Sequence, residues 1–217
     1  MHTHPSAPPH AFGHLLAGAF VMPIIRIEQR ASAVPRARAL VAGGVRVFEV
    51  LLRTPAALGA IDDIRSQVPE ATVGAGTLLG AADVAQAVAA GAQFAVTPGL
   101  TPELALAVVR HQLPTLPGVA TASEAMQAMA LGFDAVKLFP AHGLWGATQI
   151  DALQGVFPSL RFCPTGGIKP EHIATYLALR GCGGVGGSWV TPERLVAQGD
   201  WDGITALARQ AASFRRP

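Results

Sequence analysis

The 217-residue sequence contains little charge and very little lysine. Asp, Glu, Lys and Arg together make up 14% of the residues, against about a quarter in ordinary globular proteins. The basic residues are scattered, apart from Arg215 and Arg216 at the end, so no basic stripe suited to a nucleic-acid backbone is present. Half of the residues are hydrophobic, and a chain of this length and composition can bury a substantial single core.

Other absences exclude further classes of protein and site. Apolar runs are interrupted well before the ~18 residues that a transmembrane helix needs, so no membrane partner is expected. No Lys or Arg precedes Arg26, so the N-terminus does not resemble a secretory signal. Cys163 and Cys182 have no metal-ligand spacing, and we expect free thiols in a reducing cytoplasm. No cluster of histidine and carboxylate residues predicts a metal site.

The first residues differ in composition from the remainder of the chain. Residues 1–17 hold His2, His4, His10 and His14 together with Pro5, Pro8 and Pro9. Nothing rigid fixes the spacing of these histidines, which favours a mobile leader over a metal site. We therefore expect a leader over residues 1–17 and one folded domain over residues 18–217.

Short apolar runs alternate with alanine-rich segments along the rest of the chain. Eight β-like runs begin near Val21, Val45, Ala71, Phe94, Pro114, Ala135, Leu160 and Gly184. Helical segments are predicted after them, over 33–42, 55–67, 81–90, 102–110, 123–131, 147–154, 170–179 and 202–212. This alternation implies parallel strands joined by crossover helices. Eight such units predict an α/β fold, a single (β/α)8 TIM barrel, and the absence of G-x-G-x-x-G after the first run disfavours an open doubly wound sheet.

One of the only two lysines lies inside an apolar run. The segment AVKLFP places Lys137 between hydrophobic neighbours. A lysine removed from water can give up its proton and act as a nucleophilic amine, which the guanidinium of arginine cannot do. A Schiff base with a carbonyl substrate requires such an amine. The alternative is a lysine whose aliphatic stem packs while its ammonium group reaches water.

Polar residues occur where the strands of a barrel would end, which is where functional side chains of such barrels lie. Period-two alternation places Glu49, Leu51 and Arg53 on one strand face, and Lys137 with Phe139 on one face of another. If both faces point inward, a carboxylate and an amine meet in a low-dielectric site, as a nucleophile with a proton shuttle. The alternative is a buried structural ion pair, which is a poor stabiliser because desolvation offsets the attraction.

Glycine pairs follow the seventh and eighth runs. Gly166 and Gly167 stand at the end of the seventh run, and Gly187 and Ser188 stand at the end of the eighth. Loops after these two strands of a barrel commonly bind phosphate through backbone N–H groups. Ordinary tight turns would explain either pair alone, whereas their joint occurrence favours a phosphate site.

Seven segments together resemble one enzyme family. They are RVFEVLLRTPAAL, VGAGTLL, GAQFAVTPGLTPEL, LPGVATASEAM, DAVKLFPA, RFCPTGGI and GGSWV. In this order and spacing, from about Val21 to about Arg209, the chain resembles the class I 2-keto-3-deoxy-6-phosphogluconate (KDPG) and 4-hydroxy-2-oxoglutarate (KHG) aldolases. The resemblance implies a (β/α)8 barrel, usually a homotrimer, that acts without metal or cofactor in the Entner–Doudoroff pathway.

The resemblance also implies roles for individual residues. Lys137 would form the Schiff base, and Glu49 would be the general acid/base. Substrate-binding roles would fall to Arg53 and Thr77 at the pyruvyl carboxylate, Pro98 and Phe139 at the pocket wall, Thr165, Gly166, Gly167 and Ser188 at the phosphate end, and Arg26 as an extra anion contact. Leu51 departs from the family, which usually has Thr at this position, and this affects fine specificity rather than the reaction class.

The expected reaction is cleavage of KDPG to pyruvate and glyceraldehyde 3-phosphate, with 4-hydroxy-2-oxoglutarate cleaved to pyruvate and glyoxylate as a side activity. Three alternatives remain open at this point. The first is an aldolase for the galactonate epimer, because both substrates share the pyruvyl half. The second is a phosphate-binding barrel isomerase or epimerase that uses Glu49 as its base. The third is an inactive barrel that only binds sugar phosphates or acts as a scaffold for an assembly.

Overall fold

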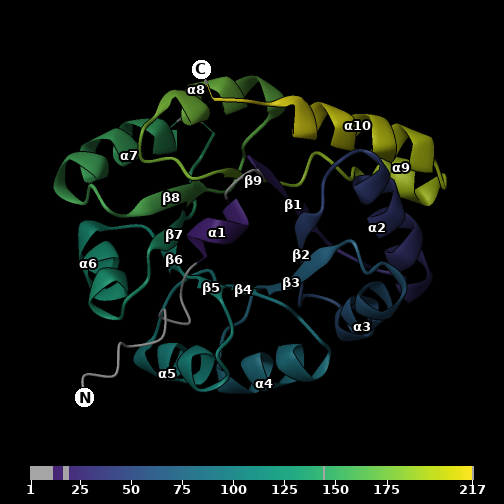
Figure 1. Ribbon diagram of the computed structural model, residues 1–217, viewed down its shortest axis with the longest axis horizontal. Coiled ribbons are helices and arrows are strands. Elements are labelled where there is room, and N and C mark those ends of the chain that lie inside the picture. The colour runs from purple at the N-terminus through teal and green to yellow at the C-terminus, as the bar shows by residue number, and fades with distance from the viewer. Residues whose placement is uncertain (1–11, 17–19, 144, 217) are drawn as a thin grey trace, which may run out of the picture.

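The computed structural model describes residues 12–16, 20–143 and 145–216. In Figure 1, viewed along the barrel, helices surround a ring of strands. The strands are all parallel to their neighbours. They are β1 (Val21–Ile25), β2 (Val47–Leu51), β3 (Thr72–Gly76), β4 (Ala95–Val96), β5 (Thr115–Leu116), β6 (Gly118–Val119), β7 (Ala135–Leu138), β8 (Arg161–Pro164) and β9 (Val185–Gly187).

The strands form two hydrogen-bonded sheets, and the edges of these sheets meet at two places to close a ring. Six strands pair in the order β5-β4-β3-β2-β1-β9, and three in the order β6-β7-β8. The fifth predicted run is divided into β5 and β6 at Pro117, which lacks an N–H group. The carbonyl of Pro117 still accepts a hydrogen bond from the N–H of Lys137 at 2.8 Å. At the other of these two places, Thr165 forms a parallel bridge with Gly186. The predicted (β/α)8 barrel is therefore confirmed.

The helices follow the strands as the alternating pattern predicts. They are α1 (Gly13–Leu16), α2 (Ala33–Ala42), α3 (Ala57–Gln67), α4 (Ala81–Ala89), α5 (Pro102–Arg110), α6 (Ala122–Ala130), α7 (Trp145–Val156), α8 (Ile173–Ala178), α9 (Glu193–Ala197) and α10 (Trp201–Ser213), with 3-10 turns η1 (Arg30–Ser32) and η2 (Pro170–His172). The main differences from the sequence prediction are the added α1 and α9, and the start of the predicted 170–179 helix as a 3-10 turn.

Capping residues explain several of the helix boundaries. Thr101 precedes α5, and its Oγ1 accepts the N–H of Leu104 at 3.2 Å, while Pro102 occupies the first turn, where no N–H is needed. Before α6, Thr121 and Glu124 form a capping box. These caps satisfy N–H groups that a helix leaves unpaired at its start, so the crossover helices begin at defined points beside the strands.

The amino ends of the strands are closed by the segment around α1. Phe12 is fully buried and packs edge-on against Phe94, with ring centroids 5.4 Å apart. Met22 and Ala135, near the start of β1 and β7, belong to the same apolar cluster. Residues 1–11, which contain most of the expected leader, lie outside the described residues. Phe12, which falls within the range expected for the leader, therefore packs with the folded domain.

Two findings concern the surroundings of the protein. In the described ranges, no helix is long and apolar enough to cross a membrane. Cys163 and Cys182 are both buried free thiols, as the sequence predicts. The expected cytoplasmic location stays a prediction.

Candidate active site

A cavity of about 460 Å³ lies at the carboxyl ends of the strands, the end of a (β/α)8 barrel where active sites are found. Its walls come from the ends of β1, β2, β7, β8 and β9 and from the loops that follow them. The lining residues are Ile24, Leu51, Arg53, Lys137, Phe139, Thr165, Gly166, Gly167, Ile168, Lys169, Gly186, Gly187, Ser188 and Trp189. Seven of the residues predicted from the sequence are therefore brought together at one cavity.

Lys137 reaches this cavity from the third position of β7, with only 5% of its surface exposed. Parallel pairing with β6 and β8 fixes its backbone opposite Gly118 and Cys163. Its Nζ atom lies 5.0 Å from the centre of the Phe139 ring, within range of a cation–π contact. The amine is thus held by packing on a rigid strand rather than on a loop.

Glu49 lies beside this amine and is completely buried on β2. Its Oε1 is 4.0 Å from the Nζ atom of Lys137. Neither carboxyl oxygen makes a hydrogen bond to another described group. Burial raises the pKa of Glu49, while the charges of Lys137 and Arg53 act in the opposite direction. A carboxyl with free oxygens and a raised pKa can both accept and donate a proton.

A glycine on the neighbouring strand makes room for this carboxyl group. Gly76 on β3 pairs with Leu51 on β2. A Cβ atom at Gly76 would come within 2.2 Å of the Oε2 atom of Glu49, so any larger residue would displace the carboxylate. The VGAGTLL segment therefore supplies the space for a group on another strand.

A hydrogen-bonded pair of polar residues follows β2 and β3. Arg53 is exposed, and its Nε atom donates to the Oγ1 atom of Thr77 at 3.0 Å. Thr77 has a positive φ of 67°, which is uncommon for a β-branched residue. The guanidinium is thus oriented at the cavity mouth, in the geometry that suits a carboxylate.

Two successive residues of the turn after β8 are glycines, so no side chain covers the backbone there. Gly166 and Gly167 have φ values of 108° and 69°, which favour glycine. The N–H of Ala141 donates to the carbonyl of Thr165 at 2.8 Å and holds this turn against the loop after β7. A Cβ atom at Gly186 would lie 2.4 Å from the Oγ1 atom of Thr165, so this glycine makes room for the threonine side chain.

Four of the predicted site residues are not among the lining residues of this cavity. Glu49 and Thr77 still contact the lining residues Lys137 and Arg53, whereas Pro98 and Arg26 have other surroundings. Pro98 packs its backbone carbonyl against Gly118, where a Cβ atom would come within 2.2 Å. It therefore supports β6 beside Lys137 instead of lining the cavity. Arg26 lines an adjoining cavity, and its Nε atom pairs with the Oε1 atom of Glu28 at 2.7 Å.

Sequence reasoning missed several of the lining residues. Ile24, Ile168 and Trp189 look like ordinary core residues in the sequence, so no local signal separates them. Lys169 could have been found from the sequence, because it is the only other lysine of the chain and lies two residues after Gly167. No group of three or more His, Cys, Asp or Glu residues in the described part of the chain could hold a metal ion.

Comparison with known proteins identifies the family of this chain. The sequence model described as "KDPG and KHG aldolase" matches residues 14–207, which is most of the chain. The chain belongs to the KDPG and KHG aldolase family. The "KHG/KDPG aldolase" of Escherichia coli K12 is 48% identical over 88% of this chain and 90% of that protein. The "2-dehydro-3-deoxy-phosphogluconate aldolase" of Dickeya dadantii is 47% identical over 92% of this chain and 93% of that protein.

Solved structures of this aldolase family agree with the fold. The KDPG aldolase of Legionella pneumophila, with pyruvate captured as a covalent carbinolamine, has a TM-score of 0.89 at 41% identity, covering 93% of this chain and 98% of that one. The KDPG aldolase of Zymomonas mobilis ZM4 with 3-phosphoglycerate has a TM-score of 0.88 at 46% identity, covering 95% and 97%. The chain is therefore an aldolase, a lyase of carbon–carbon bonds.

Proposed function

We propose that this aldolase uses a Schiff base on Lys137 to cleave KDPG to pyruvate and glyceraldehyde 3-phosphate. The observation that carries the proposal is a nearly buried amine 4.0 Å from the buried carboxyl of Glu49, on the wall of a 460 Å³ cavity. The names of the E. coli and D. dadantii relatives support this substrate, and the E. coli name also supports 4-hydroxy-2-oxoglutarate. We propose that 4-hydroxy-2-oxoglutarate is cleaved more slowly, as a side activity. Borohydride trapping with pyruvate tests the proposal.

The proposed reaction begins with attack of the neutral Lys137 amine on the C2 ketone. Glu49 donates a proton to the departing hydroxyl group, and loss of water leaves an iminium. The carboxylate of Glu49, directly or through a water, then takes the proton of the C4 hydroxyl. The C3–C4 bond breaks, its electron pair moves to the iminium to give an enamine, and glyceraldehyde 3-phosphate leaves. Glu49 returns the proton to C3, and hydrolysis releases pyruvate. The iminium supplies the charge stabilisation, so we propose that no metal or cofactor takes part.

We assign the two ends of the substrate to opposite sides of the cavity. The pyruvyl carboxylate would bind Arg53, which the hydroxyl of Thr77 orients. Phe139 would pack against the carbon chain beside Lys137. The phosphate would accept hydrogen bonds from the backbone of Gly166 and Gly167 and from the hydroxyl of Ser188. None of these groups carries a charge. Pro98 would act through β6, as a support of the Lys137 strand.

Substrate choice should depend on Thr165, which faces the cavity and is 4% exposed. Its Oγ1 atom makes only a long hydrogen bond, 3.4 Å, to the carbonyl of Cys163, so it is available to a hydroxyl at C4. A substrate that misplaces this hydroxyl leaves a buried polar group unpaired, which costs about 1–3 kcal/mol or roughly 5- to 150-fold.

We therefore expect preference for the gluconate epimer over the galactonate epimer, and erosion of this preference in Thr165→Val. The measurement is kcat/KM for the two epimers on both proteins. Equal kcat/KM values for the two epimers on the wild type would show that Thr165 does not distinguish the configuration at C4. Only the broader class of 2-keto-3-deoxy sugar acid aldolase would then remain.

We also propose a homotrimer, as the family resemblance implies. An apolar groove of about 550 Å³ runs between α5 and α6, and it exposes Leu106, Val109 and Leu131. Exposed apolar surface of this kind is commonly covered by another subunit. Sedimentation equilibrium should give three times the 22.4 kDa of the chain. A monomer at micromolar concentration would contradict this assignment.

A further inference from the structure

A second cavity of about 450 Å³ adjoins the substrate cavity. The two cavities share Ile24, Leu51 and Ser188, so Ser188 stands at their boundary. The remaining wall of the second cavity is Arg26, Glu28, Arg36, Thr191, Pro192 and Glu193. This second cavity is therefore an extension of the substrate site beyond its proposed phosphate end, and it is lined by charged residues.

Arg36 of α2 is the unusual member of this wall, because it is only 1% exposed. Its Nη1 atom donates to the backbone carbonyl of Arg26 at 2.8 Å. Its Nε atom is buried and makes no hydrogen bond to any described group. Burial lowers the pKa of Arg36, yet arginine retains its charge at physiological pH. A buried cation with incomplete partners is costly unless an anion compensates it.

The protein itself compensates this charge weakly. The facing carboxylate is Glu193, whose Oε2 atom is 4.0 Å from the Nη2 atom of Arg36, beyond hydrogen-bond distance. The Glu193 side chain is 64% exposed, so water screens its charge. The other carboxylate of this wall, Glu28, already pairs with Arg26. An anion entering the second cavity would meet a cation that is held in place and poorly neutralised.

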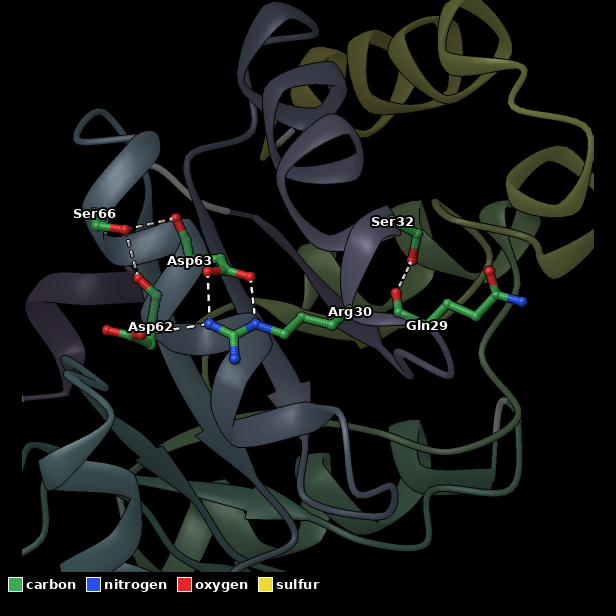
Figure 2. Close-up of polar contacts among 6 residues, drawn as sticks. All are labelled: Gln29, Arg30, Ser32, Asp62, Asp63 and Ser66. Carbon is green, nitrogen blue, oxygen red and sulfur yellow. Dashed lines mark hydrogen bonds and ion pairs between the residues drawn. The ribbon is translucent and has the colours of Figure 1, made fainter.

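The loop that carries Arg26 and Glu28 is fastened to the barrel. Figure 2 shows Arg30 reaching from this loop to α3, where it forms two hydrogen bonds with Asp63, at 2.6 and 2.7 Å. Asp62 lies 3.6 Å from the same guanidinium. In the same view, the hydroxyl of Ser32 donates to the carbonyl of Gln29. These contacts hold the wall of the second cavity in place before ligand binds, which reduces the entropy cost of binding.

We propose that Arg36 supplies the positive charge that binds the phosphate end of the substrate, acting from the second cavity at the Ser188 boundary. This inference rests on the proposed KDPG cleavage and identifies a specificity residue for it. A phosphate monoester is a dianion with three acceptor oxygens, and a guanidinium is suited to it in charge and geometry. The glycine turn and Ser188 offer hydrogen bonds but no charge. Glu193 would compete with the phosphate for the same cation.

The test compares Arg36→Met with Arg38→Met, which removes the same charge from an exposed position of the same helix. Loss of a charge-assisted hydrogen bond weakens binding by roughly 10- to 100-fold. Arg36→Met should raise KM for KDPG and the inhibition constant of inorganic phosphate by this factor. It should leave kcat/KM for the unphosphorylated sugar acid and the trapping of pyruvate on Lys137 like the wild type. Arg38→Met should change none of these quantities.

A second variant changes the same quantities in the opposite direction. Glu193→Gln removes the competing carboxylate at an exposed position, so it should lower the inhibition constant of phosphate several-fold. It also keeps the proposal testable if Arg36→Met fails to fold. Equal losses for phosphorylated and unphosphorylated substrates in Arg36→Met would assign it a structural role only.

Two other outcomes would also overturn the proposal. Weaker inhibition by phosphate without a change in KM for KDPG would make the second cavity a site for free anions. Unchanged phosphate inhibition in both variants would place the phosphate elsewhere. Failure of the wild type to trap pyruvate would instead refute the proposed function, because that readout does not depend on phosphate.

Discussion

Sodium borohydride added together with pyruvate should inactivate this protein and leave a stable adduct on Lys137. The reason is that the nearly buried amine of Lys137 lies on the wall of the cavity, 4.0 Å from a buried carboxyl that can transfer protons during attack on the ketone. Reduction then converts the reversible imine into a secondary amine that peptide mapping can locate. Lys137→Arg should fold and have no measurable turnover, because guanidinium cannot serve as the nucleophile.

The chain offers a matched control for this experiment in its only other lysine. Lys169 lines the mouth of the same cavity but is exposed and follows the glycine turn. Lys169→Arg should still trap pyruvate on Lys137. A label on Lys169, or no label, would refute the assignment of Lys137. The absence of any label would favour an isomerase that uses Glu49 as base, and turnover lost to EDTA and restored by a divalent metal would indicate a class II aldolase.

The fold could be predicted because its signal is repeated along the whole chain. Each strand run and each alanine-rich segment is weak evidence alone, but eight alternations allow few architectures. The details that were missed depend on contacts that the local pattern does not contain. Pro117 divides a predicted run because it lacks an N–H group, and Phe12 is drawn into the core by Phe94, far away in the sequence.

The site could be predicted in part, and for a similar reason. Strand alternation predicted that Glu49 shares a strand face with Arg53, and Lys137 with Phe139, but not that these faces point inward. The barrel brings Glu49 and Lys137 within 4.0 Å of each other. The role of Gly76 was hidden, because the group that needs its space belongs to a neighbouring strand. Arg36 was hidden for another reason. Helix α2 contains two arginines, Arg36 and Arg38, and the packing of α9 and of the loop after β1 against Arg36 decides which one is buried.

Glu49→Gln should reduce turnover by about 10²–10⁴-fold, the usual contribution of a positioned general acid/base. The amide keeps the shape of the side chain, which Gly76 accommodates, but it cannot exchange protons. Binding of pyruvate should change far less than turnover, because the contacts that we propose for its carboxylate are made by Arg53 and Thr77. Single-turnover measurements with KDPG separate the two effects. Near-normal turnover in the variant would transfer the proton-transfer role to another group or to a water.

The raised pKa of Glu49 also predicts opposite effects of pH on activity and on stability. Cleavage requires the carboxylate, so kcat/KM should decline on the acid side at a pH above the ordinary value for glutamate, ~4.3. Because the folded state holds this proton more tightly than the unfolded state, the contribution of Glu49 to stability is complete below the unfolded pKa. It is lost as pH rises through the folded pKa.

Glutamine mimics the protonated carboxyl group, so the effect on stability can be measured with the same variant. Glu49→Gln should have a higher Tm than the wild type at neutral and alkaline pH, and the difference should disappear below about pH 4. Calorimetry across this range, with the inactive Lys137→Arg protein as a second reference, measures the effect. An identical pH dependence of Tm in wild type and Glu49→Gln would mean that Lys137 and Arg53 compensate the buried carboxylate fully, and burial would then not be what prepares Glu49 for proton transfer.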